Sequence, residues 1–386
     1  MTEITRLAAG MEAMLPEILA MSERVVNIDS GSYLAEGVNA VIDVWADMLA
    51  DMGFAVVRDP LPERGDRMTA RLALGGAGKR LLVLGHADTV WPAGIAAEWP
   101  FKREGDRITG PGVGDMKTNV VMALHAIRML LAEGALGGLA SITVVIVPDE
   151  EIGSPQSRAW IEDESRKADL CLTLEPCRPE GGMVVGRGAV GAVYLTATGI
   201  TAHVGSAREK GASAIAALAA LVAPLEALGD PPSGLCATVG ILRGGEARQV
   251  VPGSAELHLD LRAPDDASGE ALLEEVRAIA ARPPADPRVS IAFRGGFTRP
   301  AFPTLDGTKT LYSLAEGFCA KLGIPVHPVV SRGGSDGSFA ARLGVPTLDG
   351  LGPITHETCS RREWVEVPSI VTRGAVLAGL IASAKG

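Results

Sequence analysis

The chain has few basic and few aromatic residues. Lys and Arg together number 36 against 46 Asp and Glu, which gives a formal net charge of -10, and aromatic residues make up 4% of the 386 positions. No Lys or Arg cluster, and no basic stripe interleaved with aromatic side chains, marks a surface for nucleic acid. We therefore expect no nucleic-acid partner.

Long apolar runs and paired cysteines are also missing. No stretch reaches the roughly 18 uncharged apolar residues of a membrane-spanning helix. The N-terminus carries acidic residues early and lacks a basic start followed by an apolar run, which indicates an amphipathic helix and not an export signal. The five cysteines are widely spread without a C-x-x-C pair, which favours reduced thiols. We expect a cytoplasmic protein that does not insert into membranes.

Three apolar runs predict buried strands of a largely parallel sheet. They are LLVLGHADTV from Leu81, SITVVIVPDEE from Ser141 and LCLTLEP from Cys171. The segment NVVMALHAIRMLLAEG from Asn119 is apolar on nearly every face and ends at glycine, as a crossover helix packed on a sheet does. The first part of the chain is thus predicted to be α/β.

The pattern of apolar and polar residues changes after Gly182. AVGAVYLTATG and SAELHLDLR alternate with period two, and two helical segments separate or follow them, which predicts an α+β insert with one solvated sheet face. The sequence pattern typical of an α/β domain resumes near Arg299. We predict a catalytic domain in two parts, residues 1–183 and 298–386, interrupted by an insert domain at 184–297.

Acidic and imidazole side chains follow the three predicted strands directly. His86 and Asp88 follow the first, Glu150 and Glu151 the second, and Glu175 the third. Ligands of open parallel sheets bind outside the carboxyl ends of the strands, so these groups should converge.

Asp115, in the loop GPGVGDMKTN, and His356, in GPITHE, are further candidates for the same edge. Imidazoles with carboxylates suit Zn²⁺, and a carboxylate such as Asp115 can bridge two ions.

The motifs GHADTV, GVGDMK, DEEIGS, LEP, TAHVGSAREKGASAI and GPITHE occur in one order through nearly the whole chain. Together they resemble the two-zinc aminoacylase/carboxypeptidase family of metallopeptidases, and most closely its glutamate carboxypeptidase branch, the carboxypeptidase G type. The resemblance implies a zinc-peptidase-like catalytic domain interrupted by a ferredoxin-like lid and dimerisation domain. It also implies two Zn²⁺ per subunit, with Co²⁺ or Mn²⁺ as possible substitutes, and a homodimer.

The resemblance further implies a role for each position. His86 and Glu175 would hold one zinc, Glu151 and His356 the other, and Asp115 would bridge them. The catalytic group would comprise Glu150 as general base, Asp88 as the partner that orients His86, and His203 as an oxyanion donor supplied across the dimer interface.

A substrate carboxylate requires a fixed positive charge. Arg262, at the end of SAELHLDLR, and Arg299, in TRPAF, are the candidates. Gly333, Gly334 and Ser335, in RGGSDGS, stand where related enzymes bring backbone donors to that carboxylate. Two positions depart from the family pattern: Ala207 replaces a common Pro, and Gln249 replaces an Asn that contacts substrate in relatives.

Several of these residues also have ordinary structural interpretations. Arg262 could pair with Asp260 or Glu256 of its own strand, and the thiol of Cys177 is expected to be buried and inert. The three remaining histidines are expected to serve packing or solvent contact: His125, His258 and His327.

The leading hypothesis is a metal-dependent hydrolase that releases a C-terminal amino acid, glutamate above all, from N-acyl, peptidyl or folate-like substrates. Its partner would be a small molecule or short peptide with a free carboxylate. The alternatives are an N-acyl amino acid deacylase, an acetylornithine-type deacetylase or a dipeptidase with the same centre. The complete ligand set argues against a non-catalytic binding protein. The absence of a phosphate-cradling Gly-Lys motif argues against a phosphatase.

Overall fold

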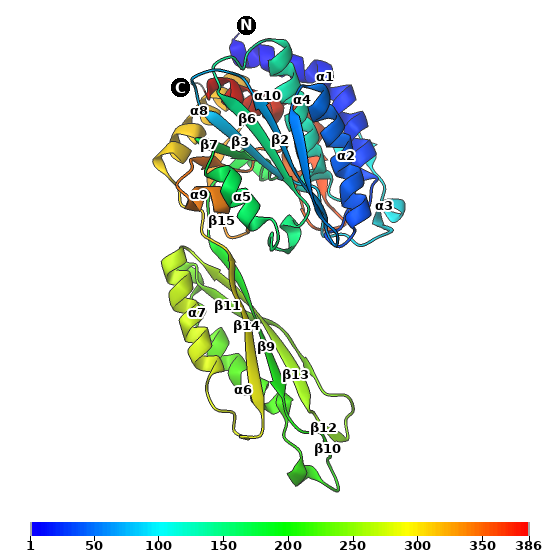
Figure 1. Cartoon of the computed structure of the whole chain (residues 1–386), viewed down its shortest axis with the longest axis vertical. Helices are drawn as coiled ribbons and strands as arrows, with labels where there is room; N and C mark the ends of the chain where they lie inside the picture. The colour runs from blue at the N-terminus through cyan, green and yellow to red at the C-terminus, as the bar shows by residue number, and fades with distance from the viewer. Residues whose placement is uncertain (1, 385–386) are drawn as a thin grey trace. The chain divides into compact units, whose positions relative to one another are not determined.

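The computed structural model describes residues 2–384 and divides the chain into two compact units (Figure 1). Unit 1 comprises residues 1–186, 303–330 and 335–386, and unit 2 comprises 187–302 and 331–334. Met1, Lys385 and Gly386, at the ends of the predicted catalytic regions, lie outside the described residues. The predicted domain limits 184–297 remain predictions, since contacts within a chain do not test independent folding.

Unit 1 contains a six-stranded sheet in the order β1-β2-β6-β3-β7-β16. The α/β class is confirmed, and the sheet is parallel from β6 through β16 but antiparallel at β1, β2 and β6. A short turn joins β1 to β2, and such a connection permits only antiparallel pairing. The strands are β1 (Ala55–Leu61), β2 (Gly65–Ala73), β3 (Arg80–His86), β6 (Ser141–Val147), β7 (Leu170–Thr173) and β16 (Thr347–Leu348).

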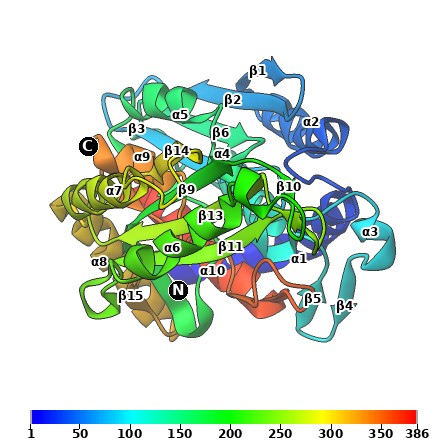
Figure 2. The ribbon, with the colours of Figure 1, turned by 90° about the horizontal axis from the view of Figure 1, so that it is seen from below.

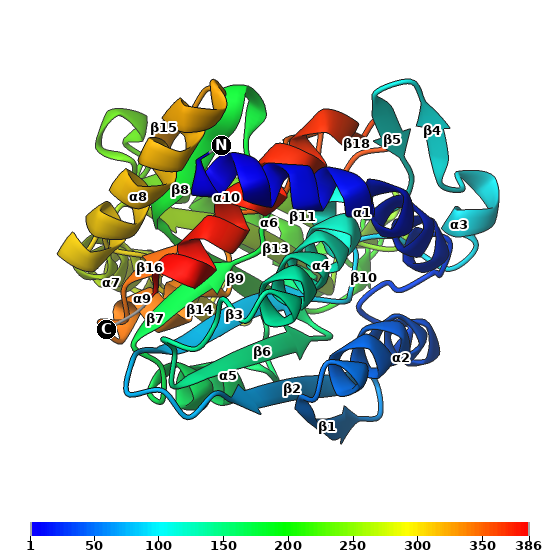
Figure 3. The same cartoon turned by 90° about the horizontal axis from the view of Figure 1, so that it is seen from above.

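Helices cover both faces of this sheet (Figure 3). The larger core lies against α1, α2, α4, α8 and α10, and the smaller against α5 and α9. The helices are α1 (Glu3–Val26), α2 (Ala35–Asp51), α3 (Ile95–Glu98), α4 (Thr118–Ala132), α5 (Arg158–Ser165), α8 (Asp306–Leu322), α9 (Gly337–Arg342) and α10 (Val367–Ser383). None of the described helices is long and apolar enough to span a membrane.

The continuous apolar runs of the central strands follow from burial on two sides. In β3, Leu81 and Val83 pack into the larger core, whereas Leu82 and Leu84 pack into the smaller one. Side chains alternate between the faces of a strand, so a strand covered on both faces must be apolar at every position. This confirms the interpretation of the three apolar runs as buried strands.

Short strands complete unit 1 beside the large sheet. The order β17-β18-β5-β4 forms a second sheet, and β8 pairs with β15. Their bounds are β4 (Lys102–Glu104), β5 (Arg107–Thr109), β8 (Gly182–Arg187), β15 (His327–Ser331), β17 (Thr355–His356) and β18 (Trp364–Glu366).

Unit 2 is an α+β layer with a four-stranded antiparallel sheet in the order β11-β13-β9-β14 (Figure 2). Alternate strand residues, among them Val193, Leu195, Leu257 and Leu259, share one core with helices α6 and α7. Its elements are β9 (Ala189–Thr198), β10 (Ala202–His203), α6 (Ala214–Glu226), β11 (Cys236–Gly244), β12 (Val250–Val251), β13 (Ser254–Ala263), α7 (Asp266–Ala280) and β14 (Ser290–Arg299).

Candidate metal centre

The carboxyl ends of β3, β6 and β7 bring one imidazole and several carboxylates together. Two groups of described residues place their ligand atoms within 4.8 Å of one another: His86 with Asp115 and Glu151, and His86 with Glu150 and Glu175. His86 is the last residue of β3, and the others lie in loops just beyond the sheet or in the turn before α4. Five residues that span 90 positions of sequence thus meet at one sheet edge, as strand topology predicts.

The two ring nitrogens of His86 have different surroundings. Nδ1 lies 2.9 Å from the backbone oxygen of Asp88 and 3.4 Å from its Oδ1. Nε2 lies 3.2 Å from Oδ1 of Asp115 and 3.9 Å from Oε1 of Glu175. A proton on Nδ1, donated to the Asp88 carbonyl, leaves the Nε2 lone pair directed at the carboxylates, which is the orientation a metal ligand requires.

The Asp88 side chain serves mainly to hold the following carboxylates in place. Its Oδ1 accepts a hydrogen bond of 3.1 Å from the backbone N–H of Glu150, and its Oδ2 accepts one of 3.1 Å from that of Glu151. Oδ2 also accepts a 2.6 Å bond from the hydroxyl of Ser32, and Asp88 is fully buried. The sequence did not single out Ser32, because 56 residues separate it from Asp88.

The carboxylate of Glu363 holds the backbone of Asp115 in place. Oε1 of Glu363 accepts hydrogen bonds from the N–H groups of Gly114 (2.8 Å) and Asp115 (3.2 Å). Burial, together with the charge of Asp115, raises the pKa of Glu363 to about 8. Sequence reasoning missed Glu363, which looks like an ordinary charge in the polar run SRREW.

The cluster concentrates negative charge in a place that is largely shielded from solvent. Burial raises the pKa of both Glu151 and Glu175 well above the usual range, and the charge of Asp115 raises them further. Burial lowers the pKa of His86, but hydrogen bonds to Asp115 and Asp88 outweigh it and hold that pKa well above its ordinary value. A cation at this place would let the carboxylates ionise and leave the imidazole neutral.

The donor set fits a metal on a second ground. Oε1 of Glu175 is buried, and among residues 2–384 it has no hydrogen-bond partner. Buried carboxylate oxygens are almost always satisfied by a donor or an ion. Carboxylate and imidazole ligands at one point are the chemistry of divalent zinc, cobalt or manganese.

His356 lies apart from this cluster. Its Nε2 lies 2.8 Å from Oε1 of Glu366, and its ring stacks on Trp364 with a centroid separation of 3.9 Å. Neither of the two ligand groups found within the described part of the chain includes it. The same loop does reach the site, since Sγ of Cys359 lies 3.6 Å from Oδ2 of Asp115. The assignment of His356 as a ligand stays a prediction.

Besides Gly333 and Gly334, four predicted residues lie in unit 2. His203 is exposed on β10, and its Nδ1 accepts hydrogen bonds from the N–H groups of Gly205 and Ser206 at 3.1 and 3.3 Å. Gln249 is exposed. Arg262 pairs with Asp260 at 2.7 and 2.9 Å, which is the structural interpretation open to it from the sequence. Arg299 is buried at the end of β14.

The glycines before α9, Gly333 and Gly334, belong to unit 2 and pack closely on arginines of the same unit. The carbonyl oxygens of Gly333 and Gly334 each accept a 3.0 Å bond from Nη1 of Arg187. A Cβ on Gly334 would lie 2.4 Å from Cδ of Arg299, so a larger residue there would force the Arg299 side chain to move. In unit 1, the Ser335 hydroxyl is buried and accepts a 3.1 Å bond from the N–H of Gly337.

A buried cluster of carboxylates and imidazole at the carboxyl edge of an α/β sheet is the arrangement of a metallohydrolase. Residues 82–383 match the peptidase family M20/M25/M40. The chain therefore belongs to this family of metallopeptidases, whose centres hold two metal ions.

Two relatives of known sequence illustrate the range of the family. The chain is 32% identical to carboxypeptidase G2 of Pseudomonas sp. (strain RS-16) over 375 residues, which cover 95% of this chain and 89% of that protein. It is 33% identical to succinyl-diaminopimelate desuccinylase of Gluconobacter oxydans (strain 621H) over 275 residues, which cover 66% of this chain and 71% of that protein.

Solved structures share the fold at low identity. Aminopeptidase PepT from Bacillus cereus ATCC 10987 matches with a TM-score of 0.76 and 22% identity, covering 96% of this chain and 98% of that chain. Human carnosine dipeptidase 1 matches with a TM-score of 0.77 and 13% identity, covering 100% and 99%. The predicted resemblance and fold class are confirmed.

Proposed function

We propose that the chain is a two-zinc hydrolase that releases a C-terminal glutamate from N-acyl or peptidyl substrates. The observation that carries this proposal is the cluster of buried and half-buried side chains of His86, Asp115, Glu150, Glu151 and Glu175. Similarity to carboxypeptidase G2 over 95% of the chain favours release of a carboxylate-bearing amino acid. An N-acyl amino acid deacylase with the same centre is the main alternative. It ranks second because the desuccinylase of Gluconobacter oxydans matches a shorter part of the chain than carboxypeptidase G2 does.

In this proposal His86 and Glu175 would hold one zinc, Glu151 and His356 would hold the other, and Asp115 would serve both. His356 would have to exchange its contact with Glu366 for the metal. The ions, when bound, polarise the scissile carbonyl and lower the pKa of water. Co²⁺ or Mn²⁺ would serve the same donor set.

Glu150 is the general base of the proposed reaction. It begins the 3-10 turn Glu150–Ile152 directly beyond β6, and Asp88 fixes its backbone. A carboxylate oxygen of Glu150 takes a proton from the attacking water and then passes it to the nitrogen of the leaving amino acid. The neighbouring Glu151 is proposed as a ligand instead; its carboxylate belongs to the group of His86 and Asp115, whereas that of Glu150 belongs to the group of His86 and Glu175.

Substrate contacts are proposed for residues that the cluster does not contain. Arg299 and Arg262 would bind the carboxylate of the leaving amino acid. Arg262 would have to exchange its pairing with Asp260 for the substrate. His203 would donate to the carbonyl oxygen as charge develops there, supplied by the second subunit of a homodimer. Further contacts are proposed for three positions: Gln249, Gly334 and Ser335.

The test is amino-acid release from zinc-loaded protein, with N-acyl glutamates, N-acyl aspartates and neutral dipeptides as substrates. Glu150→Gln should keep the zinc content and lose at least about a hundredfold in kcat, whereas Glu12→Gln, on the exposed face of α1, should match the wild type. Preference for aspartates or dipeptides would favour the deacylase or dipeptidase. Amide cleavage that is absent, or insensitive to Glu150→Gln, would overturn the proposal.

A further inference from the structure

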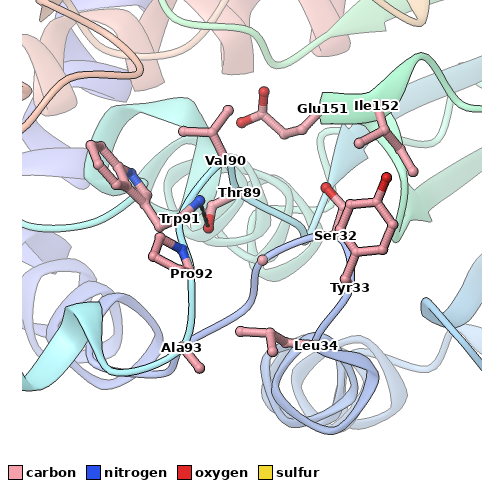
Figure 4. A pocket seen from close by; sticks show the side chains of 11 residues that line it. Ser32, Tyr33, Leu34, Thr89, Val90, Trp91, Pro92, Ala93, Glu151 and Ile152 are labelled. Atoms are coloured by element: carbon pink, nitrogen blue, oxygen red, sulfur yellow. Dashed lines mark hydrogen bonds between the residues drawn. The ribbon is translucent and has the colours of Figure 1, made fainter. Parts of the chain in front are cut away.

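A pocket of about 540 Å³ opens beside the metal centre in unit 1 (Figure 4). Its volume lies within the range of about 300–1,000 Å³ that small-molecule sites occupy. Two loops, 31–34 and 89–93, form its walls together with the turn after β6. The side chains that define it are Tyr33, Leu34, Val90, Trp91, Glu151 and Ile152.

The walls of this pocket are fixed in place by hydrogen bonds. Gly31 and Thr89 form a parallel β-bridge, which ties the two loops together. The carboxylate of Asp29 accepts hydrogen bonds from the N–H groups of Gly94 (2.6 Å) and Ala96 (2.8 Å), which holds the turn after Trp91. A preformed cavity avoids the cost of ordering its walls when a ligand binds.

The pocket is continuous with the proposed reaction centre. Glu151 lines it while its carboxylate also belongs to the ligand group with His86 and Asp115. Ser32, which also lines the pocket, donates its hydroxyl to Asp88. A group bound here is therefore within reach of the carbonyl that the centre would attack.

The lining is unusual for a surface region because it is apolar and carries no positive charge. Tyr33 is 68% exposed and Val90 is 46% exposed. Exposed apolar side chains that adjoin one another commonly mark binding sites. Within the described part of the chain, no Lys, Arg or His lines the pocket, and its one charged residue is Glu151. The guanidinium of Arg64 stacks on the Tyr33 ring at 4.2 Å and does not line the pocket.

We propose that this pocket selects the acyl side of the substrate and accepts an uncharged, apolar acyl group. This inference rests on the proposed function. The leaving amino acid carries a carboxylate, which an apolar pocket without a cation would leave buried and unpaired, so the pocket suits the other side of the scissile bond. For the same reason a succinyl group, which ends in a carboxylate, is disfavoured. Val90 and Trp91 are the specificity-determining residues.

The experiment compares kcat/KM for N-acetyl-, N-hexanoyl-, N-benzoyl- and N-succinyl-glutamate with zinc-loaded enzyme. Hexanoyl and benzoyl substrates should exceed the acetyl substrate by at least about tenfold, since each buried methylene contributes a factor of several in specificity. The succinyl substrate should fall below the acetyl substrate. Equal rates for all four, or a preference for succinyl, would overturn the inference while leaving glutamate release intact.

Variants assign the effect to the pocket. Val90→Ala should lower kcat/KM for the hexanoyl and benzoyl substrates about three- to tenfold and leave the acetyl substrate within twofold. Val57→Ala, at a similarly exposed valine on β1, is the matched control and should change neither. Val90→Lys should raise activity on N-succinyl-glutamate at least about fivefold by supplying the missing cation. Ratios of kcat/KM between the substrates that stay at their wild-type values in both Val90 variants would contradict the proposal.

A binding measurement separates this inference from catalysis. In Glu150→Gln, N-benzoyl-glutamate should change the tryptophan fluorescence because Trp91 lines the pocket, and Trp91→Phe should remove most of that change. Failure of the proposed function appears as no cleavage of any N-acyl glutamate. Failure of the pocket assignment appears as a fluorescence change that survives in Trp91→Phe.

Discussion

The hydroxyl of Ser32 donates a 2.6 Å hydrogen bond to Oδ2 of Asp88, and both residues are buried. Oδ2 also accepts the N–H of Glu151, so one oxygen joins the loop before α2 to the turn after β6. The bond connects a wall of the apolar pocket with the carboxylates of the metal centre. Positioning of Glu150 and Glu151 therefore depends on a residue that the active-site motifs do not contain.

Ser32→Ala should lower kcat about tenfold with little change in KM, because partners of the residues that surround a metal centre are worth about 10–100-fold. Ser22→Ala is the control, since the Ser22 hydroxyl is buried and has no hydrogen-bond partner among the described residues. Steady-state kinetics and thermal unfolding of both variants test this. A kcat loss in Ser22→Ala equal to that in Ser32→Ala would show that the effect is general packing.

Glu175→Gln should lower the zinc content from two ions per chain to about one, because the substitution removes an anionic ligand from a buried site. Zinc should also raise the melting temperature of the variant less than that of the wild type, since a ligand stabilises the folded state according to its affinity. Elemental analysis after dialysis measures the stoichiometry, with Glu12→Gln as control. Two tightly bound ions in Glu175→Gln would contradict the ligand assignment.

Gly31→Ala should damage both the pocket and the centre. A Cβ on Gly31 would lie 2.2 Å from the backbone oxygen of Trp91, so the two loops must separate and Ser32 must move. We expect a lower melting temperature and a reduced kcat, by the strain and lost hydrogen bond together. Gly137→Ala is the comparison, because nothing in the described chain lies within 4 Å of its added Cβ. Wild-type kcat in Gly31→Ala would show that the loops are not coupled to the centre.

Asp169→Asn should reduce stability more at neutral pH than at pH 3. A hydrogen bond from Arg80 outweighs burial and holds the pKa of Asp169 at about 2. Because this folded-state pKa is depressed, the stabilisation is present above the ordinary pKa of 3.8 and disappears as the pH falls through 2. Both side chains are partly exposed, so solvent screening limits the contribution to about 1 kcal/mol.

Urea unfolding at pH 7 and at pH 3 measures this difference for the Asp169 variant. Asp47→Asn, at an exposed position of α2, provides the control and should change neither value. A loss in Asp169→Asn that is as large at pH 3 as at pH 7 would assign it to packing instead of charge.

Much of the fold and of the ligand cluster could be predicted because the signals are local. Continuous apolar runs identified β3, β6 and β7, and the polar residues that end them identified His86, Glu150 and Glu175. The antiparallel pairing of β1 and β2 was not predicted, since partly exposed strands lack such a run. Ser32 and Glu363 act through single contacts between distant segments, and no local pattern marks them.

The sequence by itself determined the family, the α/β class and which residue types supply the carboxylates and imidazole, because side-chain periodicity and motif order are properties of the chain. Tertiary structure alone decided that Arg262 pairs with Asp260, and that His356 contacts Glu366. It also decided that two loops 58 positions apart, at Gly31 and Thr89, form one apolar pocket. Such contacts depend on how separate elements pack, and packing is fixed only when the whole core is assembled.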